Sequence, residues 1–283
     1  GSDGPLNPNI DHAPTEDHPR PRPEGLAGLG RYLHEVGRLP LLAPMSEVAG
    51  RLSAIVGSHY LQKHMGGLGR LMCGVPGVPP AKVLVLGGGV AGFNAAKVAV
   101  GMGADVTILE KGHDRMRQLD DYFRGQAKVV YSSADYIEKA VTYSDLIIGA
   151  VLVPGASAPM LVTKPMLKTM KPGTVMVDIA IDQGGCFETS RATTHANPVY
   201  VEEGVIHYCV ANMPGAVART STFALNNVTL PFVLALAGKG WRAALADDEH
   251  LRAGLNVAAG RVTHPAVARA LGYAYTDPVR LLG

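Results

Sequence analysis

The stretch KVLVLGGGVAG (82–92) decides the fold of this 283-residue chain. Its first five residues, KVLVL (82–86), have the apolar and β-branched character of a buried strand, and a Gly-x-Gly-x-x-Gly pattern follows directly. Gly87 permits a tight turn, Gly89 lets the backbone approach a pyrophosphate, and Gly92 allows a helix to pack closely on the strand. The start of that helix would present N–H groups and a positive dipole end to an anion. We interpret the stretch as a dinucleotide cradle; a glycine-rich turn that serves packing alone is the alternative.

An acidic residue at the end of the next strand supports the cradle. The stretch DVTILE (105–110) predicts a second strand, and its last residue, Glu110, lies 18 residues after Gly92, close to the roughly 20 that dinucleotide-binding units have. A carboxylate there accepts the two ribose hydroxyls and repels a 2′-phosphate, which favours NAD over NADP. Lys111 weakens this preference because its ammonium group can pair with a phosphate.

Strands and helices alternate along most of the chain. We expect further strands at 127–132, 145–151, 174–180 and 205–210. We expect helices at 46–63, capped by Ser46, and at 90–102, 113–123, 134–141, 164–170 and 221–238. Such alternation means a parallel sheet with helices on both faces. The sequence therefore predicts an α/β protein with a doubly wound sheet of the Rossmann type.

The composition narrows the class of partner and the compartment. Lys plus Arg is 26 and Asp plus Glu is 24, so the net charge is only +2, which argues against nucleic acid and anionic membranes as main partners. The chain also has no apolar run of the roughly 18 residues that span a membrane. The three cysteines have neither the paired spacing of a disulfide scaffold nor that of a zinc site. We expect a cytoplasmic protein without a metal ion.

The two ends of the chain differ from its centre. Residues 1–25 contain six prolines and only three hydrophobic residues, too few to offset the entropy of ordering. We expect a flexible segment there, with an arm that orders on binding as the alternative. We predict a variable N-terminal segment at 1–38, an NAD-binding Rossmann domain at 39–219 and a C-terminal helical segment at 220–283. The helix at 221–238 is apolar nearly throughout, which indicates a buried helix or an oligomer interface.

The remaining signals follow the later strands, at the edge where doubly wound sheets bind ligands. The loops concerned are AVLVPGASAP (150–159), DIAIDQGG (178–185) and VANMPGAVARTST (210–222). Asp182 is the carboxylate that we expect to face the cleft, and a turn-forming role is its alternative. We expect Asp178 to finish the strand or cap a turn.

Longer motifs give a resemblance to a known family. They are APMSEVAGR (43–51), GVPGVPPAKVLVLGGGVAG (74–92), IGAVLVPGA (148–156), VDIAIDQGGC (177–186) and HYCVANMPGAVARTSTFAL (207–225). Through them, residues 39–280 resemble alanine dehydrogenase, of the superfamily that includes the NAD(P) transhydrogenase α-subunit. The resemblance implies NAD-linked oxidative deamination of L-alanine to pyruvate and ammonia. It also implies a substrate domain built from both chain ends, a small amino, keto or imino acid as partner, and a homo-oligomer, either a dimer or a hexamer.

The resemblance assigns a cofactor site to the residues that match these motifs. Ser46 corresponds to a serine at the cofactor phosphates, and Glu110 stands where the family usually has an aspartate on the ribose. Asp182 corresponds to a residue beside the nicotinamide and the reacting carbon, and is the first candidate catalytic residue. The other expected cofactor contacts are Gly87, Gly89, Val90, Ala91 and Gly92 in the diphosphate loop, Lys111 beside the ribose, Ser132 or Ser133 near the adenine, and Val151, Leu152, Ile179, Val210, Asn212 and Met213 around the nicotinamide.

The chain departs from the family where the substrate would bind. The family's long N-terminal half supplies an arginine for the substrate carboxylate, a lysine for the carbonyl oxygen and a histidine as acid/base, whereas here only residues 1–38 precede the matched region, and no lysine occurs before Lys63. Tyr32-Leu33-His34 resembles the sequence around the family's histidine, so His34 is the second candidate catalytic residue, with an exposed linker histidine as the alternative. The candidate carboxylate anchors are Arg20, Arg22, Arg31 and Arg38. We expect an N-terminally shortened member with a reduced substrate domain and weak or altered activity on alanine.

Three functions stay open at the level of sequence. The first is an NAD-dependent oxidoreductase that acts on an amino or imino acid, and we favour it. The second is an enzyme that retains NAD for internal redox chemistry, elimination or imine reduction. The third is a non-catalytic NAD-binding partner protein.

Overall fold

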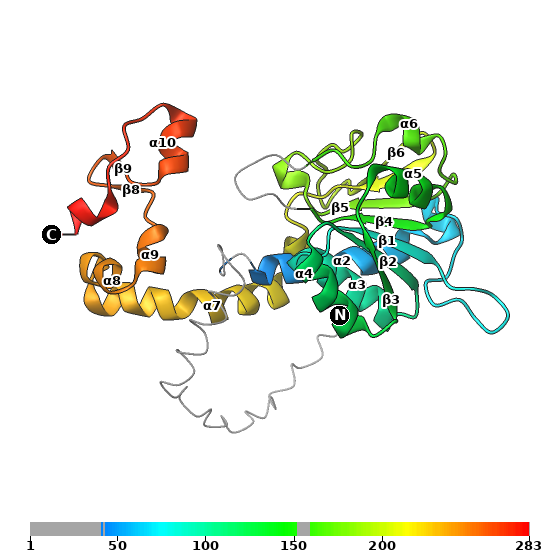
Figure 1. The fold of residues 1–283 in the computed structure, drawn as a ribbon, viewed down its shortest axis with the longest axis horizontal. Helices are drawn as coiled ribbons and strands as arrows, with labels where there is room; N and C mark the ends of the chain where they lie inside the picture. Colours follow the sequence, from blue (N-terminus) through cyan, green and yellow to red (C-terminus); the bar gives the residue numbers. More distant parts are fainter. Residues whose placement is uncertain (1–40, 42, 152–158, 283) are drawn as a thin grey trace, which may run out of the picture. The chain divides into compact units, whose positions relative to one another are not determined.

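A computed structural model of the protein describes residues 41, 43–151 and 159–282. Within these residues, seven strands form one sheet in the order β3-β2-β1-β4-β5-β7-β6 (Figure 1). Six of them run parallel, and β6 pairs antiparallel with β7 at the edge. Their bounds are β1 Lys82–Leu86, β2 Asp105–Glu110, β3 Ala127–Tyr131, β4 Leu146–Gly149, β5 Val175–Asp178, β6 Val199–Glu202 and β7 Val205–Tyr208.

The strand order confirms the doubly wound α/β fold. In sequence order, β1, β2 and β3 extend the sheet in one direction, and β4, β5 and β7 then extend it in the opposite direction from β1. The carboxyl ends of β1 and β4 therefore border the point where the winding reverses, which is where such sheets bind ligands.

Helices cover both faces of the sheet and bury two cores. On one face lie α2 (Ala43–Tyr60), α3 (Val90–Gly101) and α4 (His113–Phe123), and on the other lie α5 (Ala134–Tyr143) and α6 (Lys164–Leu167). Successive side chains of a strand point to opposite faces of the sheet. Val83 and Val85 therefore pack in the core under α2, α3 and α4, and Leu84 and Leu86 pack in the core under α5 and α6. A strand buried on both faces carries an apolar residue at nearly every position, and KVLVL does so.

The C-terminal part of the chain continues from the sheet through one long helix and several short elements. In chain order they are η3 (Met213–Val217), α7 (Ala218–Lys239), α8 (Trp241–Asp247), α9 (Glu249–Ala253), β8 (Val257–Ala258), β9 (Arg261–Val262), α10 (Pro265–Leu271) and η4 (Pro278–Leu281). Two more short helices lie earlier in the chain: η1 (Lys63–Met65) follows α2, and η2 (Ile181–Gln183) follows β5. The α7 helix contacts α2, η3 and α8.

Several expected boundaries were wrong. Ser46 does not cap its helix, because α2 begins three residues earlier; Pro44 stands in the first turn, where a proline costs no hydrogen bond. The same helix ends at Tyr60 rather than Lys63, ahead of the η1 turn, which Gly66 closes at a φ of 90°. The later strands are one to three residues shorter than expected.

The edge strand β6 was not expected at all. Its turn to β7 consists of Glu203 and Gly204, both with positive φ (50° and 77°). Two-residue hairpin turns of this kind usually carry Asn-Gly or Asp-Gly. The Glu-Gly pair therefore gave no recognisable signal in the sequence.

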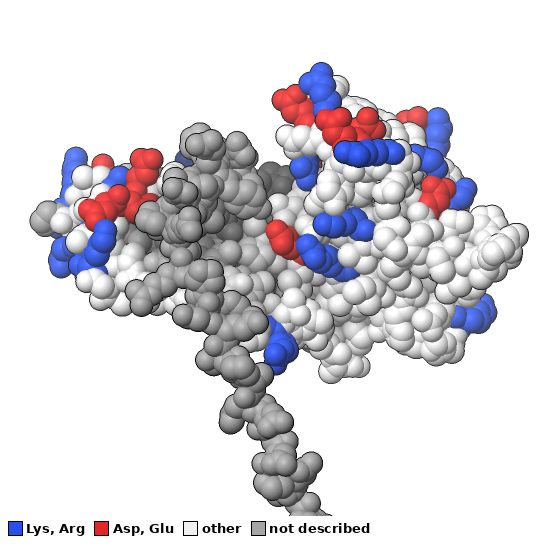
Figure 2. Space-filling model, turned by 90° about the horizontal axis from the view of Figure 1, so that it is seen from below, with Lys and Arg blue, Asp and Glu red and all other residues white. Residues whose placement is uncertain are grey.

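The charge distribution agrees with the near-neutral composition. On the face of the molecule in Figure 2, lysines and arginines lie interspersed with aspartates and glutamates. That face offers no single-sign field of the kind that nucleic acid requires.

The expectation that no segment is apolar enough to span a membrane needs correction. No unbroken apolar run has that length, but the helical segment Met213–Lys239 is long enough and, on average, apolar enough to cross a membrane, although Asn and Thr residues interrupt it. One such helix is weak support for a membrane protein.

Candidate functional site

The glycine loop after β1 has the geometry that the sequence predicted. Gly87 has a φ of 97°, and a Cβ atom on it would lie 2.9 Å from the carbonyl oxygen of Ala150. A Cβ on Gly92 would overlap the carbonyl oxygen of Gly87, so this glycine lets α3 lie against the loop. Gly89 differs from both, because a Cβ there meets no protein atom within 4 Å. Two of the three glycines thus serve the turn and the packing, and the third faces open space.

The start of α3 offers unpaired N–H groups to that open space. The amides of Gly89, Val90 and Ala91 have no hydrogen-bond acceptor among the described residues, and no side chain caps this end of the helix. An N-terminus of a twelve-residue helix with free amides and a positive dipole end is suited to an anion. Because the space over Gly89 is also clear of side chains, these residues fit a pyrophosphate group.

Helix α2 lies close to this anion-binding end. A Cβ on Gly50 would overlap the carbonyl oxygen of Ala91, so α2 touches the first turn of α3 at that point. Ser46 is one helical turn before Gly50 and therefore on the same face. Its position is compatible with a phosphate contact, although its expected role as a helix cap is wrong.

A polar clamp between α2 and α3 was missed by the sequence analysis. Arg51 Nε donates to Asn94 Oδ1 at 2.9 Å, and Asn94 Nδ2 donates to the carbonyl oxygen of Val90 at 2.9 Å. Asn94 is 4% exposed, so both bonds form where water competes little. An Arg and an Asn on two apolar helices were the only available signal for this clamp.

Glu110 is held by three backbone amides. Its Oε2 accepts from Gly88 N at 2.8 Å, and its Oε1 accepts from Lys111 N at 2.8 Å and Gly112 N at 2.9 Å. Arg115 completes the arrangement because its Nε donates to the Gly88 carbonyl oxygen at 2.7 Å. Burial lowers the pKa of Arg115, while the Glu110 charge raises it. The carboxylate is therefore fixed beside the glycine loop, and few of its lone pairs stay open to a ligand.

The two serines after β3 differ in what they do. Ser133 is the N-cap of α5, and its hydroxyl accepts from Tyr136 N at 3.2 Å. Ser132 is buried, and its backbone N–H donates to the Glu110 carbonyl oxygen at 2.9 Å. Both residues lie beside the Glu110 end of β2, on the side of the glycine loop expected for the adenosine.

The loop after β5 is organised by the fully buried carboxylate of Asp178. This group accepts from Ala180 N at 3.0 Å, Cys186 N at 2.9 Å and the Ser190 hydroxyl. Burial raises the pKa of Asp178 above its ordinary value, although these hydrogen bonds lower it. Asp178 therefore caps the turn, which was one of its two expected roles. Asp182 is exposed in η2, in the loop that follows the carboxyl end of β5.

The other loops at this edge lie close to the glycine loop. Val151 packs near Gly87, and Ile179 N donates to the Gly149 carbonyl oxygen at 2.9 Å. After β7, Asn212 is exposed in the left-handed region at a φ of 59°, whereas Val210 and Met213 are buried. Because the side chains of those two residues are buried, only their backbone groups are placed to contact a ligand.

Some expected site residues lie outside the described residues. They are His34 and Leu152, together with the candidate carboxylate anchors Arg20, Arg22, Arg31 and Arg38. Their roles stay predictions.

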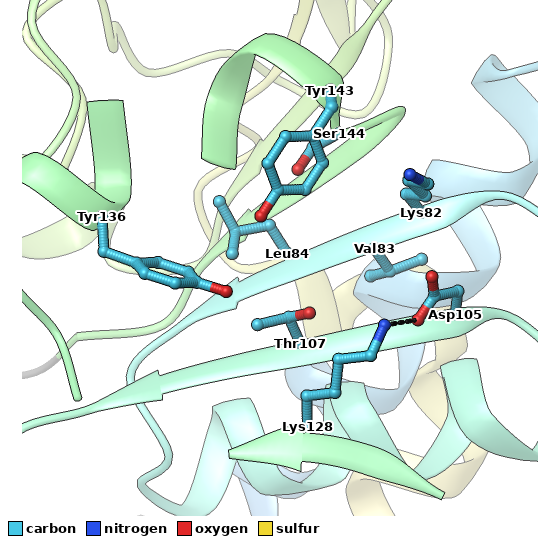
Figure 3. Close-up of a pocket in the computed structure, with 9 residues that line it drawn as sticks. All are labelled: Lys82, Val83, Leu84, Asp105, Thr107, Lys128, Tyr136, Tyr143 and Ser144. Carbon is cyan, nitrogen blue, oxygen red and sulfur yellow. Dashed lines mark hydrogen bonds and ion pairs between the residues drawn. The ribbon is translucent and has the colours of Figure 1, made fainter. Parts of the chain in front are cut away.

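A cavity of about 220 Å³ lies elsewhere, at the amino ends of β1, β2 and β3 (Figure 3). Lys128 pairs there with Asp105 at 2.8 Å, and the hydroxyls of Tyr136 and Tyr143 point into it. Burial, with the hydroxyl of Tyr136 next in effect, raises the pKa of Tyr143 to about 12. Because the glycine loop is at the opposite ends of these strands, this cavity is separate from the cofactor cradle.

Comparison with known proteins identifies the family. A family profile described as "Alanine dehydrogenase/PNT, C-terminal domain" matches residues 53–265. The chain belongs to this family. It is 63% identical over 247 residues to an alanine dehydrogenase of Halomonas elongata, covering 87% of this chain and 67% of the relative. It is 59% identical over 245 residues to an alanine dehydrogenase of Bacillus subtilis, covering 86% of this chain and 65% of the relative.

A solved structure supports the same assignment. The structure of an L-alanine dehydrogenase superposes with a TM-score of 0.81 at 51% identity, covering 83% of this chain and 65% of that one. The family resemblance expected from the motifs is thereby confirmed, and membership implies a nicotinamide cofactor. The chain spans only about two thirds of the length of these relatives.

Proposed function

We propose that this protein is an NAD-dependent oxidoreductase of the alanine dehydrogenase type that acts on a small amino or imino acid. The observation that carries the proposal is the clear space over Gly89, bordered by the free amides of α3. Relatives named alanine dehydrogenase, 59–63% identical to this chain, support the reaction class. A bound nicotinamide dinucleotide would supply the hydride acceptor, and this chain would supply its binding and orientation.

Each part of the cradle has a proposed task. The amides of Gly89, Val90 and Ala91 bind the diphosphate, assisted by Ser46 from α2. Glu110 accepts a ribose hydroxyl and disfavours a 2′-phosphate because both groups are negative, so we propose NAD rather than NADP. Lys111, Ser132 and Ser133 would border the adenosine, since all three follow the ends of β2 and β3.

The nicotinamide end is proposed from the loops after β4, β5 and β7. Val151, Ile179 and the backbone of 210–213 would form its wall, and Leu152 and His34 keep the roles given them by the resemblance. Asp182 is the candidate to face the reacting carbon, because it is an exposed carboxylate at the carboxyl end of β5. The buried Asp178 positions the turn that carries it.

The rate with alanine depends on the groups that bind the substrate carboxylate and transfer the proton. The candidate groups for the substrate carboxylate and for acid/base catalysis, Arg20, Arg22, Arg31, Arg38 and His34, lie outside the described residues, so the assay below decides the rate with alanine. Acid/base assistance alone contributes about 10²- to 10⁴-fold to a rate. We also propose residues 39–219 as the cofactor-binding part and 220–283 as the remainder of a substrate domain, in a cytoplasmic homo-oligomer.

The test is a turnover assay that follows NADH absorbance with a panel of amino and keto acids. We expect activity with at least one small amino acid, and the Halomonas elongata enzyme is assayed in parallel with alanine for comparison. Asp182→Asn should lower kcat at least about tenfold, whereas Glu138→Gln on α5, an exposed carboxylate away from the cradle, should leave it unchanged. Absence of turnover with every member of the panel would refute the proposed activity.

A further inference from the structure

The cavity at the amino ends of β1, β2 and β3 has one face of the sheet as its floor. Lys82 of β1 is level with Asp105 of β2. Leu84, Thr107 and Lys128 form the next row across the three strands. Because the two rows are two residues apart along each strand, all five side chains leave the same face of the sheet. Leu84 packs in the core under α5 and α6, so this is the face that α5 covers.

Helix α5 supplies the wall of the cavity. Tyr136 and Tyr143 are seven residues apart and therefore lie on the same face of the helix. Figure 3 shows their hydroxyls directed towards the space beside Thr107. Ser144 also lines the cavity, but its hydroxyl already donates to the carbonyl oxygen of Ala140 at 2.7 Å. The wall therefore brings two aromatic rings and two phenol hydroxyls to the charged floor.

The hydroxyl of Thr107 is the group that points to a ligand. Thr107 is only 9% exposed, and its hydroxyl has no hydrogen-bond partner among the described residues. A buried polar group without a partner costs free energy, and nearly all such groups in proteins are paired. Because Thr107 lines the cavity, an acceptor bound there would satisfy its hydroxyl.

The charged groups of the cavity leave one positive charge without a counterion. Lys128 pairs with Asp105 at 2.8 Å, so these two charges balance each other. Lys82 has no carboxylate partner among the described residues, and its ammonium group lies over the ring of Tyr143, 5.2 Å from the centroid. A ligand with a single negative charge would therefore complete the charge balance of the cavity.

The hydrogen-bonding groups beside this charge are donors. Burial, with the hydroxyl of Tyr136 next in effect, raises the pKa of Tyr143 to about 12, so the Tyr143 hydroxyl keeps its proton at neutral pH. The hydroxyls of Tyr143 and Thr107 and the ammonium group of Lys82 can all donate to an anionic oxygen. A carboxylate has the required single charge, whereas a phosphate monoester carries about 1.5–2 negative charges.

The size of the cavity and its apolar lining complete the description of the ligand. The volume of about 220 Å³ lies below the roughly 300–1,000 Å³ of pockets for drug-sized ligands, so the ligand is small. The side chain of Leu84 and the two tyrosine rings offer contacts to an apolar body. We propose that this cavity is a second ligand site, which binds a small monocarboxylate with an apolar body through Lys82, Thr107 and Tyr143.

This site goes beyond the proposed function. The cavity lies at the amino ends of the strands, whereas the cofactor cradle lies at the carboxyl ends of the same strands. Binding of the carboxylate needs no cofactor. The two sites can therefore be titrated separately, and one can fail without the other.

The experiment uses benzoate as the probe, because benzoate joins one carboxylate to an apolar ring. It is titrated into the full chain at constant ionic strength, and ligand-observed NMR gives its Kd. We expect saturable binding in the millimolar range, with benzamide, which has nearly the same shape without the charge, at least about tenfold weaker. Phenyl phosphate should also bind more weakly than benzoate, because its additional negative charge has no partner in the cavity.

Two substitutions locate the binding. Lys82→Met and Thr107→Val should each raise the Kd for benzoate at least about tenfold, because each removes a donor to a charged oxygen. Urea denaturation establishes that each variant folds, and Thr107→Val keeps the branched shape of the side chain. The matched control is Lys97→Met on α3, on the other face of the sheet, where an exposed lysine lies 5.7 Å from the centroid of the Tyr122 ring. It should bind benzoate like the wild type, and all three variants should bind NAD like the wild type in calorimetry.

Absence of saturable benzoate binding to the wild type would overturn the proposal. Equal affinity for benzamide, or tighter binding of phenyl phosphate, would overturn the assignment to a monocarboxylate. An unchanged Kd in either folded cavity variant would mean that benzoate binds elsewhere, and an equal loss in Lys97→Met would mean that net charge alone is responsible; both results would also overturn it.

Discussion

Replacing Gly89 with alanine should separate cofactor binding from folding. A Cβ at this position meets no protein atom within 4 Å, and the backbone φ of −63° suits any residue. Gly89→Ala should therefore fold normally and gain at most about 1 kcal/mol, since alanine loses less chain entropy than glycine. The added methyl group occupies the space that we assign to the pyrophosphate.

The expected loss of affinity follows from the bonds that the methyl group displaces. If the diphosphate loses two charge-assisted hydrogen bonds to the α3 amides, each worth about 1.5–3 kcal/mol, the loss is at least about 3 kcal/mol. That corresponds to roughly a 100-fold rise in the Kd for NAD. Calorimetry gives the Kd, and urea denaturation gives the free energy of unfolding.

Two other glycines of the same region serve as controls. Gly101, at the far end of α3, also has open space around it, so Gly101→Ala should bind NAD like the wild type. Gly92→Ala would overlap the Gly87 carbonyl oxygen and should lower the free energy of unfolding by about 1–3 kcal/mol or more. If Gly89→Ala binds NAD as tightly as Gly101→Ala does, the pyrophosphate does not lie over Gly89 and our reasoning is wrong.

Three further predictions concern Glu110, Asp178 and His207, which lie on three different strands of the sheet. Glu110→Gln should shift the ratio of NAD to NADP affinity towards NADP at least about tenfold, because it removes the charge beside the ribose; an unchanged ratio in calorimetry would contradict the assignment. Asp178→Asn should lower the free energy of unfolding by about 1–3 kcal/mol in urea, because an amide N–H₂ would face the donors Ala180 N or Cys186 N, and wild-type stability would count against the buried cap. Burial lowers the pKa of His207 below 6.5, so the folded protein binds this proton less tightly than the unfolded chain does; the stability that His207 contributes is present above pH 6.5 and is lost as the pH falls through its folded-state pKa. The wild type should therefore lose stability more steeply below pH 6.5 than His207→Gln, and parallel pH profiles would rule this out.

The parts of the fold that follow from local rules were predictable from the sequence. Strand β1 was predicted residue for residue, and so were the positions of Gly87 and Gly92, because a side chain at either glycine would clash with the neighbouring backbone. The beginning of α2 was not predicted correctly, because a helix can begin either with a proline in its first turn or with a serine as its N-cap, and this stretch offers both residues. The edge strand β6 was missed because its Glu203-Gly204 turn lacks the usual residues.

The site was predictable in outline only. Glu110 could be placed at the end of β2 and Asp182 in the loop after β5 from the sequence, but the three amides that hold Glu110 depend on how the loop after β2 meets the glycine loop. The bond from Arg51 to Asn94 depends on the contact of α2 with α3, which Gly50 permits and which no local pattern reveals. The apolar character of α7 was evident, whereas the sequence could not tell a buried helix from an uncovered face.

The most direct test of the account is a calorimetric titration of the full chain with NAD and, separately, with NADP. Retention of the cradle predicts saturable binding of NAD at one site per chain, with NADP at least about tenfold weaker because Glu110 opposes the 2′-phosphate. No binding of NAD, or NADP bound as tightly as NAD, would contradict the account.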